Sequence, residues 1–365
     1  MTVPFLDLSA AYGAIRHDID AAVARVLESG WFIGGPELDH FEQQFASYCG
    51  AAHCVGTGNG LDALHLLLRA ADIGRGDEVI VASNTFIATW LAVSMVDATP
   101  VAVEPDPATY NLDVAKVEAA ITDRTRAVLV THLYGQPADL EPLSALCRKY
   151  GLRLFEDAAQ AHGARYNGNR LGAHGDGVAW SFYPSKNLGA IGDGGAITCN
   201  DPAIAARVRT LGNYGSERRY VNRERGYNSR LDSLNAAVLA AKLPYLDAWN
   251  DHRRAIAGRY TSALQTAAIT LPYVPDWADP VWHLFVVRTP SRDAFQAHLS
   301  AAGVQTLIHY PIAPHKQEAY RDLSRDTPLP IAERVADEVV SLPMGPQLSM
   351  ENADRVIDAV ASWQG

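Results

Sequence analysis

The chain has 365 residues, of which 48% are hydrophobic and 20% charged, and its formal net charge is -10. This composition is typical of a globular protein, and the length exceeds the roughly 100–200 residues of a single domain. The acidic balance argues against nucleic acid or an anionic membrane as a partner, and an anionic substrate would need locally concentrated positive charge.

The N-terminal segment and the cysteines favour a cytoplasmic protein. Residues 1–20 lack the basic start and apolar run of a signal peptide. No stretch reaches the roughly 20 apolar residues that a membrane helix needs. The four cysteines contain no Cys-x-x-Cys pair and do not resemble a disulfide framework. We therefore expect no membrane partner and no metal centre.

Between about residues 50 and 200, strand-like and helix-like stretches alternate. Strands are predicted over 79–86, 99–106, 127–135, 152–159 and 177–185, and helices over 61–73, 113–121 and 140–151. Several of the strand-like stretches are almost continuously apolar, as expected for parallel strands covered on both faces. The alternation predicts an α/β fold with a mostly parallel sheet. Ligands of such sheets bind beyond the carboxyl ends of the strands.

The pattern changes after residue 230. A long helical region over 231–264 is interrupted at Pro244, and a proline-rich connection follows over 271–281. Strands predicted over 281–289 and 304–311 flank a predicted helix over 293–303, which indicates a smaller α+β unit. We place a boundary near residue 248, which predicts a large domain over 1–248 and a small C-terminal domain over 249–365.

The segment 56–68, GTGNGLDALHLLL, places glycines directly before a predicted helix. Free backbone N–H groups and the helix dipole at such a position can hold a phosphate. The segment lacks the third glycine of a Rossmann motif and the Gly-Lys pair of a Walker loop. Taken alone, it also fits a strand-to-helix turn that binds nothing.

An acidic pair and one lysine complete the candidate chemistry. Glu156 and Asp157 end a predicted strand, where a carboxylate can hold Mg²⁺, a ribose hydroxyl or a protonated ring nitrogen, or can simply support a helix dipole. Lys186 follows another predicted strand within SFYPSKNLGAIGDGGA (181–196). Most lysines are solvated, but a desolvated lysine can attack a carbonyl carbon. A phosphate cradle, a strand-end carboxylate and a nucleophilic lysine are together what pyridoxal 5'-phosphate (PLP) requires.

At this point the sequence resembles the DegT/DnrJ/EryC1/StrS group of sugar aminotransferases. The resemblance extends from FLDL at residue 5 to SLPMGP, which ends at residue 346, through SGWFIGGPEL, GTGNGLDAL, SNTFIAT, HLYGQPADL, EDAAQAHGA, SFYPSKNLGAIGDGGA, LGNYGS, GYNSRLDSLNAA and IHYPIAPH. The resemblance implies a fold type I, aspartate aminotransferase-like PLP-dependent transferase, with a large, mostly parallel sheet domain and a smaller C-terminal α+β domain.

The resemblance also implies which residues contact the cofactor ring. Lys186 would form the Schiff base with PLP and later move the proton between carbon atoms. Asp157 would pair with the pyridine nitrogen, and Gln160 would lie near the ring hydroxyl. Phe86 would stack on the ring face.

Four further residues are implied in holding the cofactor phosphate. Gly60 and Leu61 would offer backbone N–H groups and Ser181 its hydroxyl, while Asn228 would reach the phosphate from the neighbouring subunit. The protein would then be a homodimer with shared active sites. The family commonly has threonine at the position of Leu61, so this leucine is expected to act through its backbone only.

Substrate contacts are expected in two regions. Residues 216–230 concentrate five arginines in an acidic protein; most of them should be solvated, and Arg219 is expected to contact a substrate diphosphate. The resemblance places Tyr183, His309 and Tyr310 near a sugar nucleotide. A buried, satisfied histidine is the plainer interpretation of His309.

The resemblance implies transfer of an amino group from L-glutamate to a nucleotide-linked keto sugar, with the cofactor alternating between PLP and its amino form, PMP. The motifs look most like those of enzymes that act on C3 of dTDP-3-keto-6-deoxyhexoses, for polysaccharide or antibiotic biosynthesis. Alternatives are a C4-keto sugar, a UDP-3-keto uronate, a sugar dehydratase, a non-catalytic sugar-nucleotide sensor, and a nicotinamide dehydrogenase built on the 56–60 loop.

Overall fold

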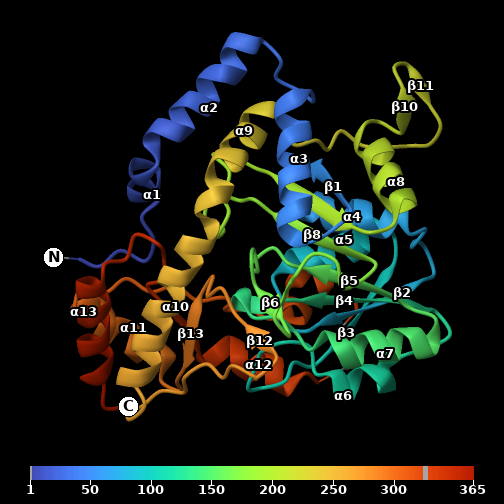
Figure 1. Ribbon diagram of the computed structural model, residues 1–365. Helices are drawn as coiled ribbons and strands as arrows, with labels where there is room; N and C mark the ends of the chain where they lie inside the picture. Colours follow the sequence, from blue (N-terminus) through green and yellow to red (C-terminus); the bar gives the residue numbers. More distant parts are fainter. Residues whose placement is uncertain (1, 324–327) are drawn as a thin grey trace.

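The protein is described as a computed structural model that covers residues 2–323 and 328–365. A central sheet has the strand order β1-β9-β8-β5-β4-β2-β3 (Figure 1). Its strands are β1 (His53–Thr57), β2 (Glu78–Ala82), β3 (Thr99–Val103), β4 (Thr125–Thr131), β5 (Arg153–Asp157), β8 (Gly177–Ser181) and β9 (Gly195–Cys199). Strands β8, β5, β4, β2 and β3 pair in parallel, and β9 runs antiparallel to both β1 and β8. The predicted α/β fold with a mostly parallel sheet is confirmed.

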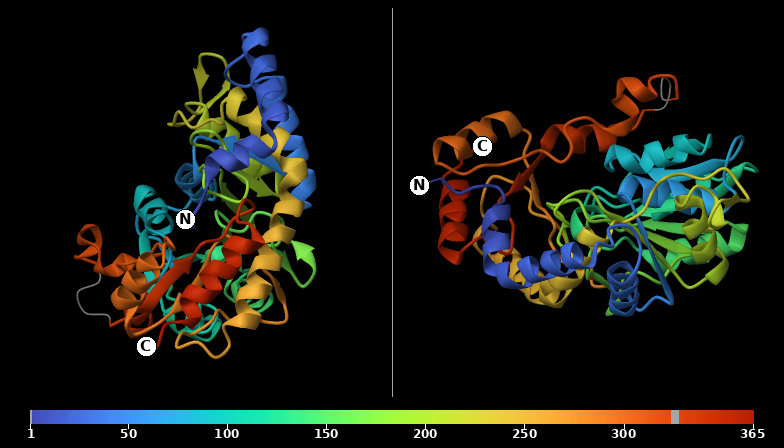
Figure 2. Two further views of the ribbon diagram at one scale, coloured as in Figure 1. Left: turned by 90° about the vertical axis from the view of Figure 1, so that its left-hand side faces the viewer. Right: turned by 90° about the horizontal axis from the view of Figure 1, so that it is seen from above.

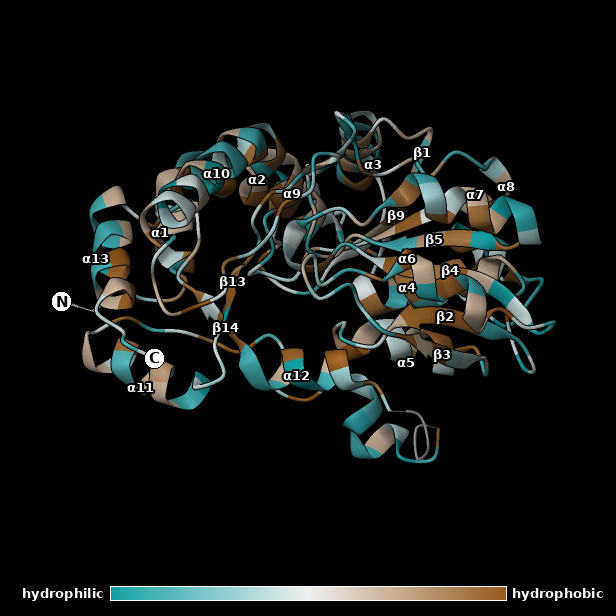
Figure 3. Cartoon of the chain, turned by 90° about the horizontal axis from the view of Figure 1, so that it is seen from below, coloured by the Kyte–Doolittle hydropathy of each residue, from teal (hydrophilic) through white to brown (hydrophobic). Residues whose placement is uncertain are grey.

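The strands are apolar because both faces of the sheet are covered. In β2, Ile80 and Ala82 belong to one hydrophobic cluster, and Val79 and Val81 belong to another on the opposite face. Successive strand residues point to opposite faces, so a strand between two helical layers needs apolar residues at every position. Figure 3 shows β2 and β4 as almost entirely hydrophobic, whereas α12 and α13 are hydrophobic on one side only.

Helices form both covering layers. One face is packed by α3 (Pro36–Cys49), α7 (Leu140–Tyr150) and α9 (Ser233–Lys242), and the other by α4 (Gly60–Ala70), α5 (Ile87–Met95) and α8 (Pro202–Gly212). The short α6 (Val114–Val117) continues as a 3₁₀ turn, Glu118–Ala120, within the predicted helix over 113–121. The N-terminal α1 (Leu8–Ala14) and α2 (Arg16–Ser29) precede these layers, and α2 lies along α9 (Figure 1).

A second hydrophobic core surrounds the antiparallel pair β13 (Phe285–Arg288) and β14 (Val339–Leu342). Residues of α10 (Leu246–Ala263), α11 (Arg292–Ala301) and α13 (Met350–Ala361) pack against it, and α12 (Pro330–Glu338) precedes β14. Val3 also lies in this core and pairs with Val304. Helix α10 crosses the expected boundary near residue 248 without a break, and the division into two domains stays a prediction.

The strand predicted over 304–311 is wrong. Only Val304 and Leu307 form isolated bridges, to Val3 and Ser341, and the rest of the segment has no ladder. The polar side chains of this segment form hydrogen bonds instead. Gln305 accepts from the backbone N–H of Phe5 at 3.3 Å. The segment is therefore irregular, and it lies beside the site described below.

Smaller elements project from the two cores. The hairpin β10 (Ser216–Arg218) and β11 (Val221–Asn222) extends beyond the sheet at the same end of the molecule as α2 (Figures 1 and 2). A three-stranded sheet joins β6 (Arg165–Tyr166), β7 (Asn169–Arg170) and β12 (Ala278–Asp279). Within residues 2–323 and 328–365, no helix has the length and apolar character to cross a bilayer, and no group of three His, Cys, Asp or Glu side chains is placed to hold a metal ion.

Candidate active site

A cavity of about 590 Å³ opens at the carboxyl end of the parallel strands. It is lined by ten of the twelve site residues predicted from the sequence, namely Gly60, Leu61, Phe86, Asp157, Gln160, Ser181, Tyr183, Lys186, His309 and Tyr310. The remaining two, Asn228 and Arg219, do not line it. The carboxyl ends of parallel strands meet at one edge of the sheet, which explains why segments distant in the sequence converge here.

The turn between β1 and α4 forms one wall of the cavity. Asn59 caps α4, and its side chain accepts from the backbone N–H of Asp62 at 2.8 Å. Gly60 and Leu61 are the first two residues of α4, so their N–H groups have no partner within the helix. A Cβ on Gly60 would lie 2.6 Å from Cβ of Ser181. Glycine therefore lets this helix end approach the Ser181 hydroxyl, as a phosphate cradle requires.

Asp157 ends β5 and is almost fully buried. Its Oδ2 accepts from the Thr89 hydroxyl at 2.8 Å, and its Oδ1 accepts from the backbone N–H of Ala159 at 3.2 Å. Burial raises the pKa of Asp157, and these two hydrogen bonds oppose the rise. A carboxylate in such a place favours a cationic partner, such as a protonated ring nitrogen.

The neighbouring Glu156 does not line the cavity. Its carboxylate lies on the other side of β5, where it contacts Nε2 of His132 at 2.9 Å and accepts from the backbone N–H of Gly175 at 2.7 Å. Nδ1 of His132 accepts from the N–H of Ala138, so Nε2 carries the proton and donates to Glu156. The structure thus separates two acids that the strand-end position alone left equivalent, and it brings to the cavity Asp157, the one that the resemblance selected.

Lys186 lies in the turn after β8 and lines the cavity. Burial lowers the pKa of its amine to about 8, although the charge of Asp157 acts in the opposite direction. A substantial fraction of the amine is therefore neutral near physiological pH, as nucleophilic attack on a carbonyl requires.

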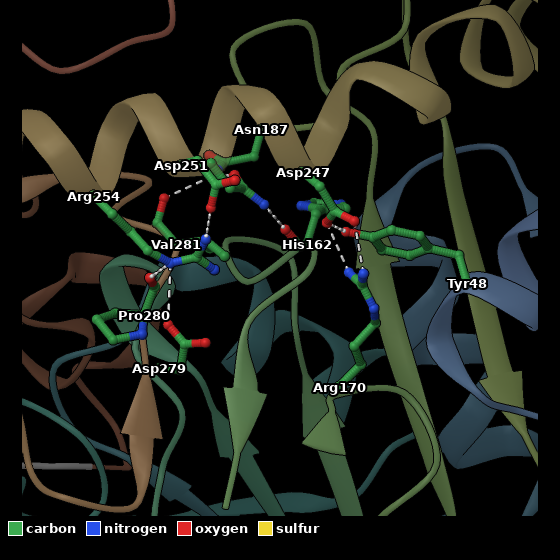
Figure 4. A network of polar contacts seen from close by, with 11 residues as sticks. Tyr48, His162, Arg170, Asn187, Asp247, Asp251, Arg254, Asp279, Pro280 and Val281 are labelled. Atoms are coloured by element: carbon green, nitrogen blue, oxygen red, sulfur yellow. Dashed lines mark hydrogen bonds and ion pairs between the residues drawn. The ribbon is translucent and has the colours of Figure 1, made fainter. Parts of the chain in front are cut away.

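The residue after the lysine fastens this turn to α10 (Figure 4). Nδ2 of Asn187 donates to Oδ1 of Asn250 at 2.9 Å and to the carbonyl of Val281 at 3.0 Å. Asn250 in turn donates to the carbonyl of His162 at 2.9 Å. Oδ1 of Asn187 also contacts Nδ1 of His283 at 3.1 Å. These buried polar groups form hydrogen bonds with one another, and together they fix the backbone of the turn that carries Lys186.

Ion pairs fix α10 itself on both sides of Asn250 (Figure 4). Asp247 accepts two hydrogen bonds from Arg170, at 2.8 and 2.7 Å, and one from the Tyr48 hydroxyl at 2.7 Å. About two turns later, on the other side of Asn250, Arg254 donates to Asp279 at 3.0 Å. The helix that supports the lysine turn is thus tied to the strands β7 and β12.

The opposite wall of the cavity comes from the irregular segment near residue 310. Nε2 of Gln160 donates to the Tyr310 hydroxyl at 2.9 Å, and Oε1 of Gln160 accepts from the backbone N–H of Tyr134 at 2.6 Å. The rings of Tyr310 and Phe86 lie 5.2 Å apart between centroids. Nδ1 of His309 contacts the Ser341 hydroxyl at 2.8 Å, and burial lowers the pKa of His309 to about 4, so the ring is neutral at physiological pH.

The cavity also contains residues that sequence reasoning did not single out. Thr85, Thr131 and His283 line it, and Thr89 holds Asp157 from behind. The hydroxyl of Thr85 contacts those of Thr89 and Thr131 at 2.9 and 3.1 Å. Thr85 and Thr89 lie within the SNTFIAT motif (83–89), so the resemblance could have predicted them as site residues. Nothing in the sequence indicated His283.

Comparison with known proteins identifies the family. The model of the DegT/DnrJ/EryC1/StrS aminotransferase family matches residues 14–361. The chain belongs to this family. The predicted resemblance and the predicted class of activity, aminotransferase, are confirmed by this match.

Two curated relatives cover almost the whole chain. "Erythromycin biosynthesis sensory transduction protein EryC1" of Saccharopolyspora erythraea is 57% identical over 98% of this chain and 98% of its own length. "dTDP-3-amino-3,6-dideoxy-alpha-D-galactopyranose transaminase" of Aneurinibacillus thermoaerophilus is 55% identical over the same shares of both chains.

Solved structures show the same fold. The crystal structure of S. venezuelae DesV in complex with a ketimine intermediate matches with a TM-score of 0.97 at 53% identity, over 99% of this chain and 98% of that one. The structure of ntda from Bacillus subtilis with the bound cofactor PMP matches with a TM-score of 0.92 at 31% identity, over 98% and 84%. The predicted fold class of the PLP-dependent sugar aminotransferases is thereby confirmed.

Proposed function

We propose that this chain is a PLP-dependent aminotransferase that moves an amino group from L-glutamate to C3 of a dTDP-linked 3-keto-6-deoxyhexose. One observation carries the proposal. A partly buried lysine with a lowered pKa and a buried aspartate line the same cavity, close enough for each charge to shift the pKa of the other. The free N-terminus of α4 opens into that cavity.

The residues present fit PLP. The backbone N–H groups of Gly60 and Leu61, together with the Ser181 hydroxyl, would hold its phosphate, and Asp157 would face its ring nitrogen. Bound PLP supplies an electron sink that lets an amino group leave one carbon atom and join another. The PMP-bound structure of ntda, a relative with the same fold, supports this assignment.

The other steps rest on side chains of this chain. The Lys186 amine, with a pKa of about 8, can accept a proton from one carbon atom and return it to another, because neither protonation state is strongly disfavoured near neutral pH. Thr89 and Ala159 keep the Asp157 carboxylate in place through two hydrogen bonds. Gln160 fixes the Tyr310 hydroxyl at the wall of the cavity.

The sugar substrate is proposed from the relatives. The Aneurinibacillus thermoaerophilus protein, at 55% identity, is a transaminase for a dTDP-3-amino-3,6-dideoxy sugar. Tyr183, His309 and Tyr310 line the cavity where such a sugar would meet the lysine. A product destined for polysaccharide or antibiotic biosynthesis, and a cytoplasmic location, stay predictions of the sequence.

We also propose that the protein is a homodimer with shared sites. Asn228 and Arg219 are exposed and lie outside the cavity. Large apolar side chains are exposed on the same end of the molecule, in the segment after α2 and on the β10–β11 hairpin, among them Trp31, Phe32, Ile33 and Tyr220. Pairing of two copies would cover these side chains and bring Asn228 to the other cavity. Sedimentation velocity tests this, and a monomer at micromolar concentration would contradict it.

A sensor without catalytic activity is the second candidate, because one relative is named a sensory transduction protein. A sensor needs a binding cavity but has no need of a lysine with a lowered pKa beside a buried carboxylate. Turnover decides between the two functions.

The deciding experiment combines absorbance with a substrate panel. The purified protein should be yellow, and L-glutamate should convert the chromophore to the PMP form. dTDP-3-keto, dTDP-4-keto and UDP-3-keto sugars are then supplied, and NMR locates the aminated carbon. Lys186→Ala should lose both absorbance and turnover, whereas Lys149→Ala, at an exposed lysine of α7 paired with Glu118, should keep both. Turnover by Lys186→Ala would overturn the proposal.

A further inference from the structure

Helix α4 supports the segment that carries Asn228 while its own N-terminus faces the cavity. Oδ2 of Asp62, in the first turn of α4, accepts from the Ser229 hydroxyl at 2.6 Å. One turn further, the ring of His65 packs edge-on against Tyr227, with 4.6 Å between ring centroids. Side chains three positions apart share one face of a helix, so this face of α4 contacts both neighbours of Asn228.

The Ser229 hydroxyl also holds the turn before α4. Its oxygen accepts from the backbone N–H of Gly58 at 3.0 Å. Ser229 is 5% exposed, and a hydroxyl has only one proton to donate. With that proton directed at Asp62 and its oxygen facing Gly58, the side chain is fixed in both directions. The turn over 58–60 therefore depends on Ser229 for its position.

The backbone on either side of Asn228 is fixed as well. The N–H of Tyr227 donates to the carbonyl of Leu211 at 2.7 Å, and the N–H of Ser229 donates to the carbonyl of Gly212 at 2.9 Å. Between them Asn228 is exposed, and its side-chain amide forms no hydrogen bond with any residue in the described part of the chain. Asn228 is thus presented outward on a rigid support.

We propose that Ser229 is a positioning residue that fixes two phosphate contacts at once: the α4 turn of its own site and Asn228 of the partner's site. The inference rests on the proposed function, since it needs both PLP and a shared dimer site. Its consequence is that loss of one buried hydroxyl weakens the grip on the cofactor phosphate in both sites while leaving the contacts to the ring unchanged.

The first test compares PLP with pyridoxal, which lacks the phosphate. Loss of a hydrogen-bonded hydroxyl should weaken PLP binding to Ser229→Ala by about tenfold, whereas pyridoxal binding should stay within about twofold of the wild-type value. Ser229→Thr keeps a hydroxyl and should restore PLP affinity. Dissociation constants come from absorbance titration of the apoprotein. Equal weakening for both ligands would show a general structural defect and overturn the proposal.

The second test isolates the contact across the dimer. One subunit carries Lys186→Ala and Ser229→Ala, and the other is wild type, so only the wild-type lysine forms the coloured species. The coloured site of this mixed dimer should bind PLP several-fold more weakly than that of a mixed dimer whose variant subunit carries Lys186→Ala alone. The reason is that the Asn228 that reaches the coloured site comes from the subunit without Ser229. Equal affinity in a dimeric, active protein would overturn this inference only. A protein that neither dimerises nor transaminates would overturn the proposed function with it.

Discussion

Replacing Lys186 by methionine should stabilise the protein when no cofactor is bound. Burial lowers the pKa of the Lys186 amine from 10.5 to about 8. One pKa unit corresponds to about 1.36 kcal/mol, so the charged amine costs roughly 3 kcal/mol of folding free energy. Methionine has a similar length and no charge. We expect Lys186→Met to raise the free energy of unfolding of the apoprotein by about 1–3 kcal/mol near pH 7.

The gain should shrink as the pH rises. At pH 7 and below, about one unit or more under this pKa, the lysine is mostly charged in both states, and nearly the full cost is present. Between about pH 8 and 10.5 the folded protein has released the proton that the unfolded chain still binds, so wild-type stability rises with pH and the difference disappears. Urea denaturation of the apoproteins near pH 7 and near pH 10.5 measures this, with Lys149→Met as the exposed-lysine control. A loss of stability near pH 7, or a gain independent of pH, would refute the reasoning.

Three further predictions concern the cofactor cavity. Gly60→Ala should abolish PLP binding in an absorbance titration and Gly74→Ala should not, because a new Cβ would lie 2.6 Å from Cβ of Ser181 in the first case and no closer than 3.5 Å to any atom in the second. Thr89→Val should lower PLP affinity roughly 10- to 100-fold, since a hydrogen bond to a charged group contributes roughly 1.5–3 kcal/mol; unchanged affinity would show that Asp157 does not depend on that hydroxyl. PLP uptake by the apoprotein should accelerate up to about pH 8 and then level off, because only the neutral Lys186 amine attacks the aldehyde; a stopped-flow profile that keeps rising to pH 10 would contradict this.

The parallel strands were predictable because both of their faces are buried. Each of the five strands predicted before residue 200 overlaps an observed one, although the observed strands are shorter and β2 and β4 begin before the predicted start. Strands β1 and β9, HCVGT and GAITC, were missed because each lies directly beside a glycine-rich turn, at 56–60 and 189–195, that the sequence marked as a loop. Their burial arises from the sheet itself: Ala196 packs on one face and Ile197 on the other. Such a strand is recognisable only once its neighbours are known.

The site was predictable where the chemistry lies at strand ends and in the turn before α4. Alternation along β5 implies that only one of Glu156 and Asp157 faces the cavity, but not which one. The choice between the two acids depends on the buried His132, which forms a hydrogen bond with Glu156 on the face of β5 away from the cavity. The contact between Thr89 and Asp157 depends on how α5 packs over the sheet, and His283 comes from the C-terminal part of the chain. Both contacts join parts of the chain that are far apart in sequence, so no local sequence pattern predicts them.

The charges that line the cavity bear on the proposed homodimer with shared sites. Among its lining residues in the described part of the chain there is no arginine, and its acids Asp157 and Asp193 are matched only by Lys186, whose amine is partly neutral. A diphosphate carries negative charge that such a cavity does not balance. The projecting segment over 216–230 carries five arginines. Within residues 2–323 and 328–365, Arg219 forms no ion pair, and its guanidinium lies 5.0 Å from the ring centroid of Tyr220. If the proposed substrate is correct, we expect this segment of a second copy to supply the missing positive charge, as the proposed role of the exposed Asn228 also requires.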